Sequence, residues 1–390
     1  MKATEGGTAL SAIGTALRPR TTLTLLMAVV TVTCGGLMGA RTLPAAAATR
    51  IAAESVVRAY VSNDGSGTVT PINTATNKPA KAIKVGKDPG EIGITPNGAT
   101  AYVPNTGGGT VTPITTATNA PGTPISVGTE PEIAAITPNG ATAYVSNYGS
   151  GTVTPITTAT NKPGTPISVG TGPAVIAITP NGKTAYVTNY GSGTVTPITT
   201  ATNAPGTPIT TGANPVAIAI TPNGATAYVV NGGSDTVTPI TTATSKPGTP
   251  INVSEEPAGI AITPNGKTAY VTNYGSGTVT PITTATNKPG TPINVGSGPQ
   301  IVAITPNGKT AYVTNYGSGT VTPITTATNA PGTPITTGAN PFWVAITPNG
   351  KTAYVTNYGS GTVTPITTAT NATGTPIKVG KDPERLTITP

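Results

Sequence analysis

The sequence predicts an all-β fold, an eight-bladed β-propeller, and three observations lead to it. A tyrosine recurs every 42 residues, and a fixed period of this size indicates a repeat architecture. Each unit holds four short runs rich in Val, Ile, Thr and Tyr, separated by Pro, Gly and Asn, with no 3.6-residue apolar period. The two ends of the chain also carry complementary parts of one unit. The spaced tyrosines are Tyr60, Tyr102, Tyr144, Tyr186, Tyr228, Tyr270, Tyr312 and Tyr354.

One repeat shows the expected elements in order. Turn-forming Pro-Asn-Gly, Tyr-Gly-Ser-Gly and Ala-Pro-Gly clusters separate its apolar runs. Four antiparallel strands repeated every 40–45 residues or so are typical of a propeller blade. The alternative is a parallel β-helix, but its coils are shorter and lack three tight reversals per period. The expected strands cover 176–179, 185–189, 194–198 and 207–211.

The ends of the chain predict how the ring closes. The first repeat starts with a second strand at 56–63, and residues 384–390 form a first strand with no second strand after it. We therefore expect 384–389 to pair with 56–63 in one split blade, so that 56–390 form eight complete blades. Such closure removes the exposed sheet edges that all-β proteins must avoid.

The motif Ala-Tyr-Val-Thr-Asn, preceded by Thr-Pro-Asn-Gly-Lys-Thr, resembles the YVTN-family β-propeller repeat, and the resemblance covers the chain after residue 55. It implies a secreted or surface-layer propeller of a prokaryote, often one without an assigned activity. Seven-bladed members are familiar, so a count of eight departs from the family. The motif stands at 185–189, 269–273, 311–315 and 353–357.

Proline stands at position 197, and at its equivalents in the other repeats, where the family usually has an apolar strand residue. Because proline cannot donate a hydrogen bond to a β-ladder, we expect the third strand to pair poorly there.

The N-terminal segment, residues 1–48, has the pattern of a secretory signal peptide, followed by a short linker at 49–55. Arg18 and Arg20 precede an apolar run at 23–32, and four alanines at 45–48 offer a cleavage site. The alternatives are a retained membrane anchor, for which the run is short, and lipidation at Cys34. The prediction is a protein that is secreted or held at the cell surface of a prokaryote.

Residue types exclude most catalytic chemistry. The chain contains no histidine, and its single cysteine lies in the predicted leader, which rules out Ser-His-Asp and Cys-His centres and His-based metal sites. The Gly-Ser-Gly at 191–193 lacks the lysine and the helix of a phosphate-binding loop. We expect no catalytic residue, metal or cofactor, and only carboxylates remain as acid–base candidates.

The junction between the fourth strand of one repeat and the first strand of the next differs in every copy. Such junctions should surround the mouth of the central channel, where aromatic and polar groups form a default ligand site. The bland alternative is neutral variation in a tolerant loop. Consecutive junctions around the closed ring predict a site for a sugar or a cationic amine, formed by Phe342, Trp343, Asp382, Glu384, Arg385, Asp88, Glu91, Glu130 and Glu132.

A second location is possible for the ligand. The loop between the second and third strands carries an additional tyrosine in five repeats. If the junction aromatics do not bind, these loops are the next candidates. The tyrosines are Tyr148, Tyr190, Tyr274, Tyr316 and Tyr358.

Charge divides the predicted ring into two faces. Of eleven acidic residues after residue 48, eight lie in the junctions, whereas lysines stand on the opposite face without acidic neighbours. With sixteen basic residues the exported chain carries about +5, and we expect attraction to an anionic wall polymer or membrane surface. The lysines are spread singly, so nucleic acid is not expected, and ordinary solubilising charge is the alternative. They are Lys78, Lys162, Lys183, Lys246, Lys267, Lys288, Lys309 and Lys351.

The sequence thus favours a binding or structural scaffold outside the cell, with a glycan, wall polymer or surface protein as partner. The alternative is a carboxylate-dependent hydrolase or lyase acting at the channel mouth. Scattered loop carboxylates would support binding, whereas one close pair with a raised pKa would support catalysis.

Overall fold

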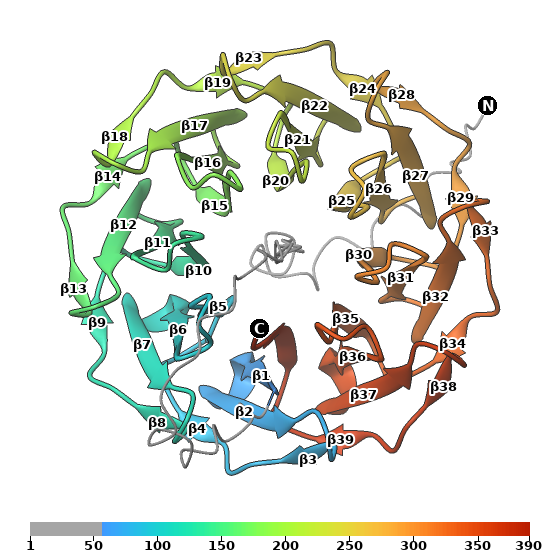
Figure 1. The fold of residues 1–390 in the computed structure, drawn as a ribbon, viewed down its shortest axis with the longest axis horizontal. Helices are drawn as coiled ribbons and strands as arrows, with labels where there is room; N and C mark the ends of the chain where they lie inside the picture. The colour runs from blue at the N-terminus through green and yellow to red at the C-terminus, as the bar shows by residue number, and fades with distance from the viewer. Residues whose placement is uncertain (1–56) are drawn as a thin grey trace, which may run out of the picture.

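Eight β-sheets stand around a central axis in a closed ring in the computed structural model, which describes residues 57–390 (Figure 1). The predicted eight-bladed β-propeller is confirmed. The predicted leader and linker lie outside the described residues. Within 57–390 no helix is long and apolar enough to cross a membrane.

Each blade has an innermost strand next to the axis (Figure 1). In blade 2 this strand is short, and Glu91 before it forms an isolated bridge with Ile133 of blade 3. A Cβ on Gly90 or Gly93 would collide with the carbonyl oxygen of Glu132 or Ala134 in blade 3. The innermost strands of blades 1 to 8, numbered in chain order, are β40 (Pro383–Ile388), β5 (Gly93–Ile94), β10 (Pro131–Ile136), β15 (Pro173–Ile178), β20 (Pro215–Ile220), β25 (Pro257–Ile262), β30 (Pro299–Ile304) and β35 (Pro341–Ile346).

The second and third strands pair as an antiparallel hairpin of six residues each in every blade. The second strands are β1 (Arg58–Asn63), β6 (Thr100–Asn105), β11 (Thr142–Asn147), β16 (Thr184–Asn189), β21 (Thr226–Asn231), β26 (Thr268–Asn273), β31 (Thr310–Asn315) and β36 (Thr352–Asn357). The third strands are β2 (Thr68–Asn73), β7 (Thr110–Thr115), β12 (Thr152–Thr157), β17 (Thr194–Thr199), β22 (Thr236–Thr241), β27 (Thr278–Thr283), β32 (Thr320–Thr325) and β37 (Thr362–Thr367). Short 3-10 turns join them in blades 1, 2 and 8: η1 (Asp64–Ser66), η2 (Thr106–Gly108) and η3 (Tyr358–Ser360).

The outermost strand differs from its prediction, because it is split into two pieces of two residues. The expected strand at 207–211 is β18 and β19, which pair with opposite ends of β17. The pieces in blades 1 to 8 are β3 (Lys78–Pro79) and β4 (Ile83–Lys84), β8 (Ala120–Pro121) and β9 (Ile125–Ser126), β13 (Lys162–Pro163) and β14 (Ile167–Ser168), β18 (Ala204–Pro205) and β19 (Ile209–Thr210), β23 (Lys246–Pro247) and β24 (Ile251–Asn252), β28 (Lys288–Pro289) and β29 (Ile293–Asn294), β33 (Ala330–Pro331) and β34 (Ile335–Thr336), and β38 (Ala372–Thr373) and β39 (Ile377–Lys378).

Pro197 explains this split and corrects one expectation. The third strand does not pair poorly with the second, because Pro197 stands opposite Tyr186 in an unbroken ladder. The carbonyl of Pro197 accepts a 2.7 Å hydrogen bond from the Gly206 amide of the outer segment. Its imide nitrogen faces the same outer side, since the N and C=O of one strand residue point to one neighbour. The missing donor therefore interrupts only the outer ladder.

Ring closure occurs as the chain ends predict. β40 pairs antiparallel with β1, with Ala59 opposite Ile388 and Val61 opposite Leu386. The amide of Thr389 also donates to the carbonyl of Arg58 at 2.9 Å. The last strand of the chain thus completes blade 1.

The 42-residue tyrosine period has a structural cause. Tyr228 of blade 5 is fully buried, and its hydroxyl donates to Oδ1 of Asn287 in blade 6 at 2.6 Å. The equivalent tyrosines of six other blades make the same contact with an asparagine of the next blade, and Tyr354 of blade 8 reaches Asn77 of blade 1 in this way. Blade 4 is the exception, because Tyr186 meets Ser245 at 3.3 Å. Burial raises the pKa of Tyr270 to about 12, so the hydroxyl stays a donor at neutral pH.

The core lies between neighbouring blades rather than inside any one of them. Tyr60 and Val69 of blade 1, for example, share one apolar cluster with Ile92, Val103 and Ile114 of blade 2. Each sheet buries both faces in this way, which explains why strict apolar–polar alternation is missing from the sequence.

Candidate ligand-binding face

Two sets of loops share one side of the ring, which we call the junction face. They are the junctions that enter each innermost strand and the hairpin loops between second and third strands. Hydrogen bonds join the two sets: the amide of Thr171 donates to Oγ of Ser192 at 2.6 Å, and Lys381 N to Ser66 Oγ at 2.6 Å. On the opposite side, the turn face, Thr158 Oγ1 donates to the carbonyl of Gly140 at 2.6 Å.

Part of the junction variation has a backbone explanation. One position in every junction has a positive φ, a conformation that favours Gly, Asn and Asp. Asp88, Glu130 and Asp382 of the predicted site stand at this position, where the other repeats have Gly, Asn or, in blade 6, Glu256. Oδ2 of Asp382 lies against Gly65 of the hairpin loop, where a Cβ would collide with it. These carboxylates are half-buried and help to shape the turn.

The predicted aromatic pair is packed inside the ring. Phe342 is 3 % exposed and lies between two hairpin-loop tyrosines, with ring centroids 6.3 Å from Tyr316 and 6.5 Å from Tyr358. Trp343 is 4 % exposed, and its backbone amide donates to Oγ1 of Thr356 at 3.0 Å. Both rings support their neighbours, and neither presents a free face at the channel mouth.

Trp343 belongs to a set of buried residues, one at the equivalent position of each innermost segment. It belongs to the same apolar cluster as Ala217, Ala258 and Ile301, so the cluster that holds this large ring includes residues of other blades. Sequence reasoning missed this shared cluster because it compared repeats one at a time. The set consists of Arg385, Glu91, Ile133, Val175, Ala217, Gly259, Ile301 and Trp343.

Three of the predicted residues do come together, from blades 1, 2 and 3. Arg385 is 1 % exposed, and its NH1 donates to the carbonyl of Glu132 at 3.2 Å. Its guanidinium lies 3.9 Å from Oε2 of Glu91 and 3.9 Å from Oε2 of Glu132. The amide of Glu91 in turn donates to the carbonyl of Glu132 at 2.9 Å.

Two carboxyl groups, one in this cluster and one beside it, are unusually weak acids. Burial raises the pKa of Glu91 to about 7, although the Arg385 charge acts in the opposite direction. Burial also raises the pKa of Asp64 to about 7, with further contributions from Glu384, Asp88 and Asp382. Asp64 was not among the predicted site residues. Its hairpin loop becomes a neighbour of Asp382 only because the ring closes, and the Asp64 amide donates to the Asp382 carbonyl at 3.0 Å.

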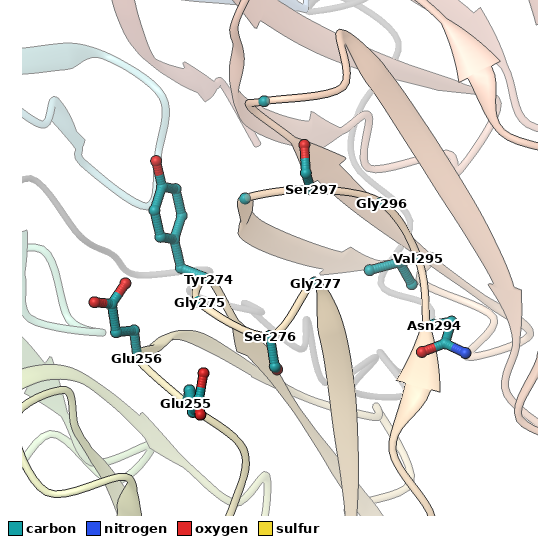
Figure 2. Close-up of a pocket in the computed structure, with 12 residues that line it drawn as sticks. Glu255, Glu256, Tyr274, Gly275, Ser276, Gly277, Asn294, Val295, Gly296 and Ser297 are labelled. Carbon is teal, nitrogen blue, oxygen red and sulfur yellow. The ribbon is translucent and has the colours of Figure 1, made fainter. Parts of the chain in front are cut away.

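A groove opens on the junction face between blades 6 and 7, with a volume of about 910 Å³. Glu255 and Glu256 lie on one wall, the ring of Tyr274 stands beside them, and Ser297 lies across the groove (Figure 2). Burial and the Glu256 charge raise the pKa of Tyr274, so its hydroxyl remains protonated. Two exposed carboxylates next to a phenol and two serines can bind ammonium or hydroxyl groups.

The same location two blades earlier holds a smaller groove of about 310 Å³, formed around Tyr190 by Gly191–Gly193 and 211–214. It has no carboxylate. The sequence pointed to the tyrosine-bearing loops as a second location, but it did not distinguish one of the five.

The eight lysines all lie exposed, away from the junction face. Lys78, Lys162, Lys246 and Lys288 begin the outer strands β3, β13, β23 and β28. The other four follow the Pro-Asn-Gly turns of the turn face. Within residues 57–390 no group of three His, Cys, Asp or Glu side chains is arranged to hold a metal ion.

Comparison with known proteins gives the fold and no family. No protein-family model and no curated protein sequence matches the chain. Among solved structures it is similar to Kuenenia stuttgartiensis hydrazine synthase, with 27% identity and a TM-score of 0.61 over 74% of this chain and 99% of that one.

Two further neighbours share the architecture at low identity. The dihydro-heme d1 dehydrogenase NirN is 13% identical, with a TM-score of 0.75 over 87% of this chain and 76% of that one. The virginiamycin B lyase from Staphylococcus aureus is 15% identical, with a TM-score of 0.57 over 69% of this chain and 91% of that one. At these identities the likeness concerns the fold alone.

Proposed function

We propose that this chain is an exported propeller of the YVTN type that serves as a binding scaffold at the cell exterior, with its ligand site on the junction face. Its partner is a glycan, a wall polymer or a surface protein that presents cationic or hydroxyl groups. The leader pattern and the repeat motif support the location.

One observation carries the proposal: the junctions, which differ in every repeat, all lie on one face, and both grooves open there. Many polar side chains of the second and third strands, by contrast, stabilise the blades. In blade 4, for example, Nδ2 of Asn189 donates to Thr194 and Thr196, and the tyrosine contacts join the blades. Variable loops on a constant, rigid scaffold are typical of binding sites.

The groove between blades 6 and 7 offers the best contact surface. Glu255 and Glu256 are exposed and face open space beside the half-buried ring of Tyr274. Around the opposite arc, the five half-buried members of the predicted site are all carboxylates, whereas Phe342 and Trp343 are covered. The accessible chemistry is therefore acidic, and it favours an amine or a polyhydroxylated ligand over stacking on tryptophan.

A glycan array and a cell-wall pull-down with the exported chain test this proposal. We expect Glu255→Gln with Glu256→Gln, and separately Tyr274→Ala, to reduce capture severalfold. Tyr190→Ala is the matched control, because it alters the equivalent groove that has no carboxylate. The proposed site would be contradicted if Tyr190→Ala reduced capture as much as the variants of the larger groove do. It would also be contradicted if none of the variants changed capture.

A second candidate, a carboxylate-dependent hydrolase or lyase, is favoured by the acidity of the channel cluster. A carboxyl group with a pKa of about 7 is suited to donate a proton at neutral pH, and both Asp64 and Glu91 have this property. One of the structural neighbours is itself a lyase. Turnover of any bound glycan that disappears in both Asp64→Asn and Glu91→Gln would establish catalysis, and binding without turnover would exclude it for that ligand.

A further inference from the structure

Seven repeats carry the tripeptide Gly-Thr-Pro on the outer rim of the ring, between the two pieces of the split outer strand. The first repeat has Ala80-Lys81-Ala82 instead. Every one of the seven threonines is exposed. They are Thr123, Thr165, Thr207, Thr249, Thr291, Thr333 and Thr375.

Several other threonines of the repeat use their hydroxyls in hydrogen bonds that hold the fold together. In blade 4, Thr179 donates to Oδ1 of Asn181 at 2.8 Å, Thr194 accepts from Asn189 at 3.0 Å, and Thr200 donates to Gly182. Among residues 57–390, the hydroxyl of Thr207 has no hydrogen-bond partner, and the same holds at its six equivalents. The fold makes no use of these seven hydroxyl groups.

The local backbone places each of these threonines at the surface. The amide of Gly206 donates to the Pro197 carbonyl at 2.7 Å, and a Cβ on Gly206 would lie 3.1 Å from Cγ of Pro197. The glycine therefore lies against the blade, and Thr207 follows it at the rim. Pro208 comes next, and proline biases the residue before it toward an extended conformation. The result is an extended, exposed threonine flanked by turn residues, repeated around the ring.

We propose that the seven Gly-Thr-Pro threonines are sites of O-glycosylation. Threonine-rich, proline-containing segments with exposed hydroxyls are the usual acceptors of such sugars. The threonine oxygen attacks the anomeric carbon of a sugar activated as a phosphate ester, on a nucleotide or a polyprenyl carrier. The bond from that carbon to the phosphate oxygen breaks, the phosphate leaves with the electron pair, and the hydroxyl proton passes to a base of the transferase.

The test is mass spectrometry of the protein isolated from the organism that encodes it. We expect an intact mass above the sequence mass by whole numbers of sugar residues, with fragmentation that places sugars on Thr207 and its equivalents. Substituting all seven by valine keeps the side-chain shape, and since no hydrogen bond is lost, the ring should still fold and its mass excess should disappear.

The chain contains its own control. Thr199 and its equivalents in other blades are exposed as well, but another threonine follows each of them in place of proline. Sugars on the Thr199 set instead of the Gly-Thr-Pro set would overturn the proposal, and so would a native protein with its unmodified mass.

Discussion

The two faces of the ring are built from the same eight repeats, but they use them differently. On the turn face, the tyrosine of each blade contacts the same loop position of the next blade, with Ser245 as the one departure from asparagine. On the junction face, the channel-lining position ranges from Gly259 to Trp343 and Arg385. The comparison shows that the turn face holds the blades in register, which leaves the junction face free to vary.

The largest expected effect tests the ring that both faces share. Deleting 384–390 removes β40 and leaves β1 with an exposed edge. It also removes Arg385 and Leu386, which are buried at 1 % exposure. We expect a substantial fall in the melting temperature measured by calorimetry. An unchanged transition would show that blade 1 does not need its innermost strand.

A smaller loss is expected from Trp343→Ala on the junction face. The side chain is 4 % exposed in an apolar cluster, so its truncation should cost about 3–5 kcal/mol of unfolding free energy. Denaturant unfolding measures this value. A stable variant that only loses ligand would mean that the ring of Trp343 is a contact surface after all, and that the junction face tolerates even this change.

Asp64 should make the stability of the fold depend on pH in the direction opposite to that of an ordinary carboxylate. The pKa of Asp64 is raised from 3.8 to about 7, so the folded state binds its proton more tightly than the unfolded chain. The stability that this group contributes is therefore full below about pH 4 and is lost as the pH rises toward 7. Asp64→Asn should be more stable than the parent protein at pH 8 and gain nothing at pH 4.

Unfolding curves of both proteins from pH 4 to pH 8 measure this difference. A constant difference across the range would show that Asp64 does not titrate there. The effect should be smaller than that of Trp343→Ala, because part of the Asp64 environment is solvent, which screens the neighbouring charges.

The tyrosine contacts offer a matched pair on the turn face. Tyr144 donates to Asn203 at 2.6 Å, whereas Tyr186 meets Ser245 at 3.3 Å. Both loop residues have positive φ, which asparagine adopts more readily than serine. We expect Asn203→Ser to lose about 1 kcal/mol and Ser245→Asn to gain about 0.5–1 kcal/mol, typical values for one hydrogen bond. Negligible changes in unfolding free energy for both variants would contradict a structural role for these tyrosine contacts.

The smallest effect on stability is expected from the eight lysines. Replacing all of them by glutamine should leave the thermal transition nearly unchanged, because the side chains are exposed. Salt-sensitive adsorption to an anionic polymer should disappear, since such attraction is screened beyond about 8 Å at physiological salt. Adsorption that survives both the substitution and high salt would contradict the electrostatic account of this surface.

Local features of the sequence determined the blade count and the closure. The tyrosine period, the turn clusters and the missing strands at each end act within one repeat or at fixed separations, so they can be read along the chain. The split of the outer strand was harder to predict from the sequence, because the effect of Pro197 depends on which neighbouring strand its nitrogen faces.

Only the tertiary structure decided the candidate site. Arg385, Glu91 and Glu132 belong to three blades, and Trp343 is buried in an apolar cluster that includes residues of other blades, such as Ala217. The burial of side chains and the electric field near the axis depend on eight strands that converge on one channel. Neither can be deduced from the sequence of a single repeat. The sequence could identify which residues vary, but the packing of the whole ring determines which of them meet solvent.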